Sequence, residues 1–544
     1  MRRRCVILFV VLSTLPSSSL LAQEHDHSTP AASIPLEILE RPLPLRTGIG
    51  VSHMPVTTSS ANAQKYFDQG LAYLHSYVWI EAARSFNQAL RLDPALAMAY
   101  LGLSYAYSGL GAASAAKAVL EKARSYGSHL SELERQRISI RAAQIDAIAN
   151  PADQTKRSAY VQSIDRALTL FPNDVELWLL RGHAEEPSPS GWGQRGGESS
   201  LKYYEKALAI SPNNFAAQHY VTHALENMGR INEALVHGEA YAKQAPMVAH
   251  AQHMWGHDLR RVGRIDDAIK QFEKAYELEI AYYKTENIPA EFDWHHQHNL
   301  DLLAGAYQYV GRMKAAEQKF RESYNFLAHS QQENLVLDKR GWPLLLLAQG
   351  RNQEVLDSAR LLTDLPWPSA RAIGHTMASH ALMAMGNLQE ASSEAKAAIA
   401  EAQREPSAGP YINPYLALLQ GEFFLRTGQG DQGRNLLKAV EAKVRAEPGP
   451  DAWSQALFVL DMIGRLGVRL GDWQLAEFTA RQMSQHDSNY AGTHFLTGLV
   501  DEHNKDAAGA IKEFKLALAG WNRADPDLPE LAQIKAKIAA LTGP

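Results

Sequence analysis

The sequence predicts an all-α fold, a superhelical solenoid built from about ten to twelve helix pairs. Residue types recur with a period of about 34 residues, the length of a two-helix repeat. Within each period, small and aromatic residues follow the three- and four-residue spacing of a helix face, and a glycine or proline closes the unit. Stacked pairs of this kind bury one continuous core, so most of the chain is expected to be helical.

The first clear repeat starts near Ala63 and ends at Pro94. Small residues let its two helices approach closely, aromatic residues fill the remaining space, and proline cannot continue the second helix. The defining positions are Tyr66, Gly70, Tyr73, Ala82, Phe86 and Ala89. The register returns downstream from Phe215, Ala249 and Gln297, and weaker copies keep the turn glycines Gly350, Gly386, Gly428 and Gly471.

This pattern resembles the tetratricopeptide repeat (TPR), and the resemblance covers most of the chain after the leader. It implies a right-handed superhelical solenoid of TPR-like helix pairs, in which the first helix of each pair lines a concave groove. Residues 66–71, 253–261 and 293–300 resemble more narrowly a family of secreted bacterial TPR proteins of unassigned activity. The chaperone-binding lysine and asparagine clamp of TPR proteins is replaced here by histidine.

The chain divides into five predicted segments. Residues 1–22 have the arginines and the apolar run of a secretory signal peptide, and residues 23–60 form an extended N-terminal tail. Residues 61–172 carry N-terminal TPR and irregular helical repeats, 173–330 a His-rich TPR segment with insertion loops, and 331–544 C-terminal TPR-like repeats. We therefore expect a periplasmic or extracellular protein without a lipid-modification signal or a membrane span.

Composition excludes several functions. The single cysteine, Cys5, lies in the leader, so the exported chain has no disulfide and no thiolate ligand. Cleavage would also remove three arginines and no acid, which moves the formal charge from −5 to −8 (−5 minus 3). An acidic chain argues against nucleic acid as a partner. No nucleophile motif, phosphate loop or haem signature occurs, so the sequence leans away from an enzyme.

Histidines concentrate in the central repeats. Nine of the 21 lie between residues 219 and 298: His219, His223, His237, His250, His253, His257, His295, His296 and His298. Each residue can be given a slot, which is its position counted from the start of its repeat. His219 and His253 then share slot 5, and His223 and His257 share slot 9. His250 and His298 share slot 2. These slots are spaced i, i+3, i+7 and lie on one helix face, which the TPR resemblance places in the open groove.

A divalent metal site is the favoured interpretation. Imidazoles at i, i+4 can chelate an ion, and a second pair on the next helix completes a tetrahedron. Without thiolates, zinc or copper is the expected cofactor. The candidate metal ligands are His183, His219, His223, His250, His253 and His257. Other candidate ligand-binding residues are Trp192, Arg195, Glu226, Trp255, Trp294, His298 and Asp301.

Three functional hypotheses remain open from the sequence. The first is an exported scaffold whose His-rich groove binds a peptide, a protein or a small ligand together with a divalent metal. The second is a metal-dependent enzyme in which Glu226 acts as general base. The third is a purely structural protein–protein scaffold, in which the histidines form only a polar groove floor.

Overall fold

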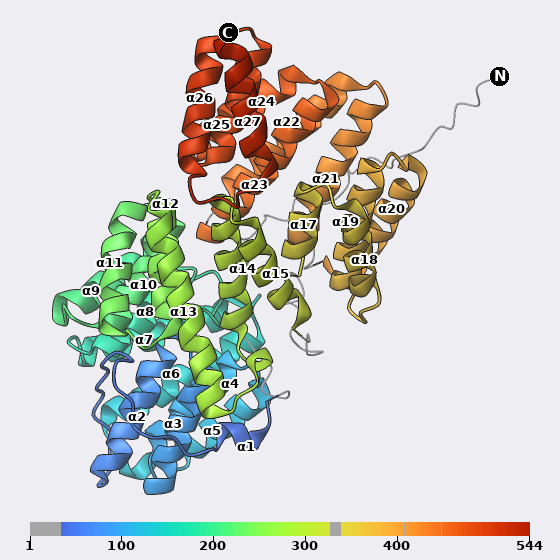
Figure 1. The fold of residues 1–544 in the computed structure, drawn as a ribbon. Helices are drawn as coiled ribbons and strands as arrows, with labels where there is room; N and C mark the ends of the chain where they lie inside the picture. Colours follow the sequence, from blue (N-terminus) through green and yellow to red (C-terminus); the bar gives the residue numbers. More distant parts are fainter. Residues whose placement is uncertain (1–33, 327–338, 407–408, 448, 544) are drawn as a thin grey trace. The chain divides into compact units, whose positions relative to one another are not determined.

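The computed structural model describes residues 34–326, 339–406, 409–447 and 449–543, and within these ranges the chain is helical, with no β-strand (Figure 1). Each helix packs mainly against its neighbours in sequence, so the chain is a series of TPR-like helix pairs. This confirms the predicted all-α fold of TPR-like repeats. The predicted signal peptide lies outside the described residues. Within the described helices, none combines the length and the apolar character that a membrane span requires.

The chain divides into two compact units at the boundary between Asn299 and Leu300. The described helices up to this boundary are α1 (Leu36–Leu39), α2 (Ala61–Leu74), α3 (Trp79–Leu92), α4 (Ala97–Gly109), α5 (Ala113–Arg124), η2 (Gly127–His129), α6 (Glu132–Ala149), α7 (Gln154–Leu170), α8 (Val175–His183), α9 (Glu198–Ile210), α10 (Phe215–Asn227), α11 (Ile231–Gln244), α12 (Ala249–Arg261), α13 (Ile265–Glu286) and η3 (Ala290–Phe292). The boundary falls inside α14 (Trp294–Tyr309).

The C-terminal unit continues the same architecture. Its further described helices are α15 (Met313–Asn325), α17 (Gly341–Ala348), α18 (Asn352–Thr363), α19 (Pro368–Ala384), α20 (Leu388–Arg404), α21 (Gly409–Arg426), α22 (Gly430–Ala446), α23 (Pro450–Leu470), α24 (Trp473–His486), α25 (Ala491–His503), α26 (Ala507–Gly520) and α27 (Pro529–Thr542). Within this unit the loop after α26 returns to the turn after α14, where the Asp525 backbone N–H donates to the Gly311 carbonyl at 3.1 Å.

Close helix packing explains the small residues of the repeat. A Cβ atom added at Gly70 or Gly102 would lie 2.6 or 2.4 Å from the ring of Phe86, which is fully buried. Helix α3 can therefore press Phe86 against both α2 and α4 only because glycine stands at these two positions. Phe272 and Phe514 occupy the same place in later repeats and are also fully buried.

The turns between paired helices need a left-handed residue, and glycine usually supplies it. Glycines with positive φ stand there at Gly111, Gly229, Gly263, Gly311, Gly350, Gly386, Gly428 and Gly471. Two repeats depart from this rule, because Tyr77 (φ 58°) and Lys505 (φ 67°) hold the same conformation one 34-residue period from Gly111 and from Gly471 (111 − 77 and 505 − 471). Tyr77 lies beside the histidines.

The segment that precedes α2 packs against the N-terminal unit in an extended form. The Gly48 carbonyl accepts a hydrogen bond from the Met247 backbone N–H at 2.8 Å, and the Arg41 guanidinium donates to the Glu286 carbonyl at 2.6 Å. Thr57 binds the Glu134 carboxylate through both its backbone N–H and its hydroxyl. This segment thus joins parts of the N-terminal unit that are distant in sequence.

Candidate metal centre

Two helices of the N-terminal unit and the first turns of a third bring six histidines together in two groups. Helix α10 supplies His219 and His223, α12 supplies His250, His253 and His257, and the first turns of α14 supply His298. Each of these residues is 7% exposed or less. The histidines are therefore buried, whereas the sequence predicted an open groove.

The first triad consists of His219, His223 and His250. The Nε2 atom of His219 lies 3.1 Å from Nε2 of His223 and 3.0 Å from Nε2 of His250. A tetrahedral ion about 2.0–2.1 Å from each nitrogen would set the nitrogens about 3.3–3.4 Å apart. The three nitrogens therefore stand close to the separation that one ion requires.

The second triad consists of His253, His257 and His298, whose ligand atoms lie within 4.8 Å of one another. The ring centroids of His253 lie 4.4 Å from His257 and 4.8 Å from His298. Both triads follow one rule: slots 5 and 9 of one repeat combine with slot 2 of the next. The same slots therefore recur in both triads, although the insertion before α14 sets His298 48 residues after His250 (298 − 250) instead of 34.

This grouping differs from the predicted one. The sequence predicted two i, i+4 pairs around one ion, but the structure places His219 and His223 in one triad and His253 and His257 in the other. The histidine at slot 2 of the next repeat completes each triad, because it faces the i, i+4 histidine pair of the preceding repeat. His298, predicted only as a ligand-binding residue, thus belongs with the metal candidates.

Backbone and amide oxygens fix the tautomer of one histidine in each triad. Nδ1 of His219 lies 2.7 Å from the His75 carbonyl, which can only accept, so Nδ1 carries the proton and Nε2 keeps its lone pair. In the second triad, Nδ1 of His253 lies 2.9 Å from Oδ1 of Asn299. The Asn299 amide nitrogen donates to the Phe272 carbonyl at 3.3 Å, which orients the oxygen toward His253. Such outer contacts are typical of metal-ligating histidines.

Glu226 lies between the two triads. Its Oε2 is 3.6 Å from Nδ1 of His223, and its Oε1 is 3.6 Å from Nδ1 of His257. The carboxyl group is 1% exposed. One carboxylate therefore faces a histidine of each triad from the side opposite Nε2, where it can orient both rings.

Burial keeps three of the triad histidines neutral. The pKa values of His219, His250 and His253 lie well below 6.5, first because burial penalises the charged ring and second because neighbouring imidazoles repel a proton. Burial likewise raises the pKa of Asp258, beside Glu226, well above its ordinary value. Neutral imidazoles are the form that binds a metal ion, so the electrostatics of the cluster favour an ion over protons.

A further histidine, His295, lies between the triads. Its ring centroid is 5.1 Å from that of His250 and 4.7 Å from that of His253. Its Nδ1 contacts Oε1 of Glu279 at 2.5 Å, and His296 contacts the other oxygen of Glu279 at 2.7 Å. Although burial raises it, the pKa of Glu279 falls to about 2 because both histidines face the carboxylate. His295 was among the clustered histidines of the sequence but had no predicted role, and Glu279 was not predicted.

Tyr77 covers the first triad. Its ring centroid is 4.8 Å from His219 and 5.1 Å from His250, and its hydroxyl donates to the Trp192 carbonyl at 2.7 Å. Trp192 in turn packs against Trp79, with centroids 4.8 Å apart. Other repeats usually have glycine at this turn position. A tyrosine there could have identified Tyr77 as a candidate site residue from the sequence, since left-handed strain in a non-glycine residue often marks a functional site.

The remaining predicted residues lie at varied distances from the triads. His183 packs edge-on against Tyr220, with centroids 4.5 Å apart, and burial lowers its pKa to about 3. Trp294 is buried, and its ring lies 5.9 Å from His250 and 6.2 Å from His298. In the inserted loop, the Arg195 backbone N–H donates to Glu186. Trp255 on α12 and Asp301 on α14 are half-buried and stand outside both triads.

The fold and the site together define a TPR-like helical-repeat protein with paired histidine triads. No protein-family model and no curated protein matches the chain. Among solved structures it is similar to YrrB, described as a TPR protein with an unusual peptide-binding site, at 15% identity over 38% of this chain and 96% of that chain, with a TM-score of 0.26. It is also similar to a human IFIT1 dimer with PPP-AAAA, at 13% identity over 78% and 90% of the two chains, with a TM-score of 0.39.

Proposed function

We propose that this protein binds two divalent transition-metal ions, one in each histidine triad of the N-terminal unit. The convergence of three Nε2 atoms in the first triad, within 3.0–3.1 Å of the central His219, carries the proposal. Nδ1 of His219 is engaged by a carbonyl, and Glu226 faces Nδ1 of His223. With Nδ1 of each ring engaged in this way, the Nε2 lone pairs of His219 and His223 point at each other. A cation between the two nitrogen atoms removes the repulsion between these lone pairs.

A purely structural role explains the triads less well. Buried polar groups are normally paired, and an unpaired one costs about 1–3 kcal/mol. Nε2 of His253 and Nδ1 of His250 have no hydrogen-bond partner among the described residues. A metal ion would give the Nε2 atom of His253 a partner without any rearrangement of the outer contacts.

The donor set indicates which ions fit. Imidazole nitrogen suits zinc and copper, and neither triad offers a thiolate. Three protein ligands leave a fourth position for water or a small ligand, as in catalytic rather than closed structural zinc sites. Glu226 is oriented toward the ligand histidines, which favours an anchoring role over that of a general base. If residues 1–22 direct export, as we propose, the protein would encounter zinc and copper outside the cytoplasm.

Metal stoichiometry tests the proposal. The full chain, purified without an affinity tag, should bind two equivalents of Zn²⁺ or Cu²⁺ by elemental analysis after dialysis. His223→Ala and His257→Ala should each leave one equivalent, and the double variant should leave none, because each substitution removes a ligand from one triad.

His237→Ala is the matched control, since His237 lies on α11, contacts Gln218 and belongs to neither triad. It should keep both equivalents. Wild-type protein that binds no ion, or single variants that still bind two, would contradict the proposal.

A further inference from the structure

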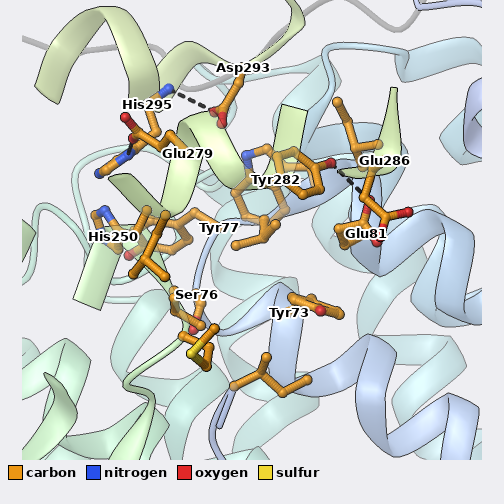
Figure 2. Close-up of a pocket in the computed structure, with 18 of the residues that line it drawn as sticks. Tyr73, Ser76, Tyr77, Glu81, His250, Glu279, Tyr282, Glu286, Asp293 and His295 are labelled. Carbon is orange, nitrogen blue, oxygen red and sulfur yellow. Dashed lines mark hydrogen bonds and ion pairs between the residues drawn. The ribbon is translucent and has the colours of Figure 1, made fainter. Parts of the chain in front are cut away.

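A cavity of about 270 Å³ leads from the surface of the N-terminal unit to the first triad (Figure 2). It lies between α13, the turn after α2, and residues 46–49. The exposed residues of its lining are Arg46, Thr47, Met247, Ala281 and Thr285. All six triad histidines are described, and of these His250 alone lines the cavity. The cavity therefore connects solvent with a ligand of one of the two proposed ions.

The ring of Tyr77 stands between this cavity and the first ion. Tyr77 lines the cavity and also lies over the triad, with its ring centroid 4.8 Å from His219 and 5.1 Å from His250. Its hydroxyl donates to the Trp192 carbonyl at 2.7 Å, and Trp192 packs against Trp79, another residue of the cavity wall. An ion can pass between the cavity and the triad only when this ring moves aside. The hydrogen bond to Trp192 restrains that movement.

The charges of the wall do not oppose a divalent cation. Four acidic side chains line the cavity, namely Glu81, Glu279, Glu286 and Asp293. In Figure 2, Glu81 and Glu286 lie on one side of the cavity and His250 on the other. Arg46 is the one lysine or arginine among the described lining residues, and it pairs with Glu286. Behind the wall, Arg84 pairs with Glu81 and Glu286 at 2.6 and 2.9 Å. Acidic side chains thus outnumber arginines, and carboxylates hold both arginines.

We infer that this cavity is the path by which the ion of the first triad enters and leaves, and that the Tyr77 ring gates it. This inference rests on the proposed metal-binding function. It makes the two ions kinetically unequal, because no histidine of the second triad lines the cavity. A block in the cavity should therefore slow exchange of the first ion and leave exchange of the second unchanged. The equilibrium affinity should stay the same, since a barrier changes the rates of uptake and release by one factor.

Release of Zn²⁺ from variants that hold a single ion tests this path. His257→Ala retains the first triad, and His223→Ala retains the second. Each full-length variant is loaded with Zn²⁺, freed of excess ion and mixed with an excess of a chromophoric chelator, whose absorbance follows the release. A rate that does not depend on the chelator concentration reports the departure of the ion itself.

Two tryptophan substitutions on α13 narrow the outer part of the cavity. Ala281 and Thr285 are exposed, line the cavity and stand one helical turn apart. In the His257→Ala background, Ala281→Trp and Thr285→Trp should each slow release at least tenfold, with one equivalent still bound at equilibrium. Ile280→Trp is the matched control, since Ile280 is 41% exposed and is not among the lining residues, and it should not change the rate. In the His223→Ala background, all three substitutions should leave the rate unchanged.

Tyr77→Phe tests the gate. It keeps the ring over the triad and removes the hydroxyl that donates to Trp192. In the His257→Ala background it should speed release about three- to tenfold, which is the effect of losing one hydrogen bond. The metal content should be unchanged, and so should the release rate in the His223→Ala background.

The outcomes separate the two proposals. If neither single-triad variant binds Zn²⁺, the metal-binding function is wrong and the path is overturned with it. If one equivalent binds but both tryptophan variants on the path release it as fast as Ile280→Trp, only the path is overturned. Equal slowing of release from the two triads, or a Tyr77→Phe variant that releases no faster, would also overturn it, because the barrier to exchange would then lie elsewhere.

Discussion

At the scale of single residues, the centre depends on contacts behind the histidines as much as on the histidines themselves. The His75 carbonyl and Asn299 each bind the Nδ1 atom of one imidazole, and Glu226 faces the Nδ1 atom of another. These contacts orient the Nε2 atoms toward the proposed ion. Outer contacts of this kind tune metal affinity and select the tautomer. Glu226 is unusual because it serves both triads at once.

Glu226→Gln should therefore weaken both sites together. The amide keeps the shape of the side chain but removes the negative charge that faces Nδ1 of His223 and of His257. We expect a loss of about 10- to 100-fold in affinity for each of the two ions, measured by competition with a chromophoric chelator. A loss at one site only would show that Glu226 does not link the triads.

Tyr77 combines backbone strain with burial. Tyr77→Gly would relieve about 1 kcal/mol of left-handed strain but would remove a ring that is 2% exposed, at a cost of about 3–5 kcal/mol. Net destabilisation by about 2–4 kcal/mol is expected in urea unfolding. Lys505→Gly is the matched control, because Lys505 is exposed at the equivalent turn, and it should stabilise the protein by about 1 kcal/mol or less. Similar effects of the two substitutions would contradict this account.

At the scale of helices, the repeat explains both the fold and the multiplication of the site. The 34-residue period predicted the helix pairs, the glycine turns and the shared slots of the histidines, because these features depend on local spacing. The period could not reveal which helices complete each triad. That depends on how α14 begins after the loop at 287–293, which sets the position of His298 relative to α12.

The burial of the cluster was also beyond sequence reasoning. It depends in part on the ring of Tyr77, which comes from a part of the chain more than 100 residues before the histidines of α10 and α12. The sequence could nevertheless have indicated that slot 2 of the next repeat completes the set at slots 5 and 9. After each of the two histidine pairs, slot 2 of the next repeat is again a histidine, His250 or His298. The sequence thus contained the residues of the triads but not their grouping.

Helix packing gives a prediction that is independent of metal. Gly102→Ala would place a Cβ atom 2.4 Å from the ring of Phe86, between α3 and α4. Overpacking of this kind costs about 1–3 kcal/mol, more than the gain in helix propensity from glycine to alanine. Gly127→Ala is the control, since a Cβ atom there has no neighbour within 4 Å. Thermal unfolding should show a lower midpoint for the first variant and an unchanged one for the second.

At the scale of the whole molecule, the candidate metal chemistry is confined to one of the two units. Both histidine triads lie before residue 300 among the described residues. Histidines of the C-terminal unit pair individually, as His375 does with Glu394 and His494 with Glu513. The acid sensitivity of the protein should therefore originate mainly in the N-terminal unit.

Acid should destabilise the metal-free protein below about pH 6.5, the ordinary pKa of histidine in an unfolded chain. Burial holds the pKa of His219, His250 and His253 well below that value and lowers that of His183 to about 3. Below pH 6.5 the unfolded chain therefore binds more protons than the folded one, and the free energy of unfolding falls as pH falls. Each such histidine contributes up to about 1.4 kcal/mol per pH unit.

Glu279 acts at a lower pH, because its folded pKa of about 2 means that its stabilising effect is lost only below about pH 4.5. Urea unfolding of chelator-treated protein at pH 7.5, 6.5 and 5.5 separates these ranges. Stability should fall by about 1–2 kcal/mol between the first two values, because the unfolded histidines are already half protonated at pH 6.5, and by about 4 kcal/mol more at the third. Zn²⁺-loaded protein should resist this loss, because the ion occupies the nitrogens that protons would otherwise take. A metal-free protein equally stable at all three values would show that these histidines are not held neutral in the folded chain.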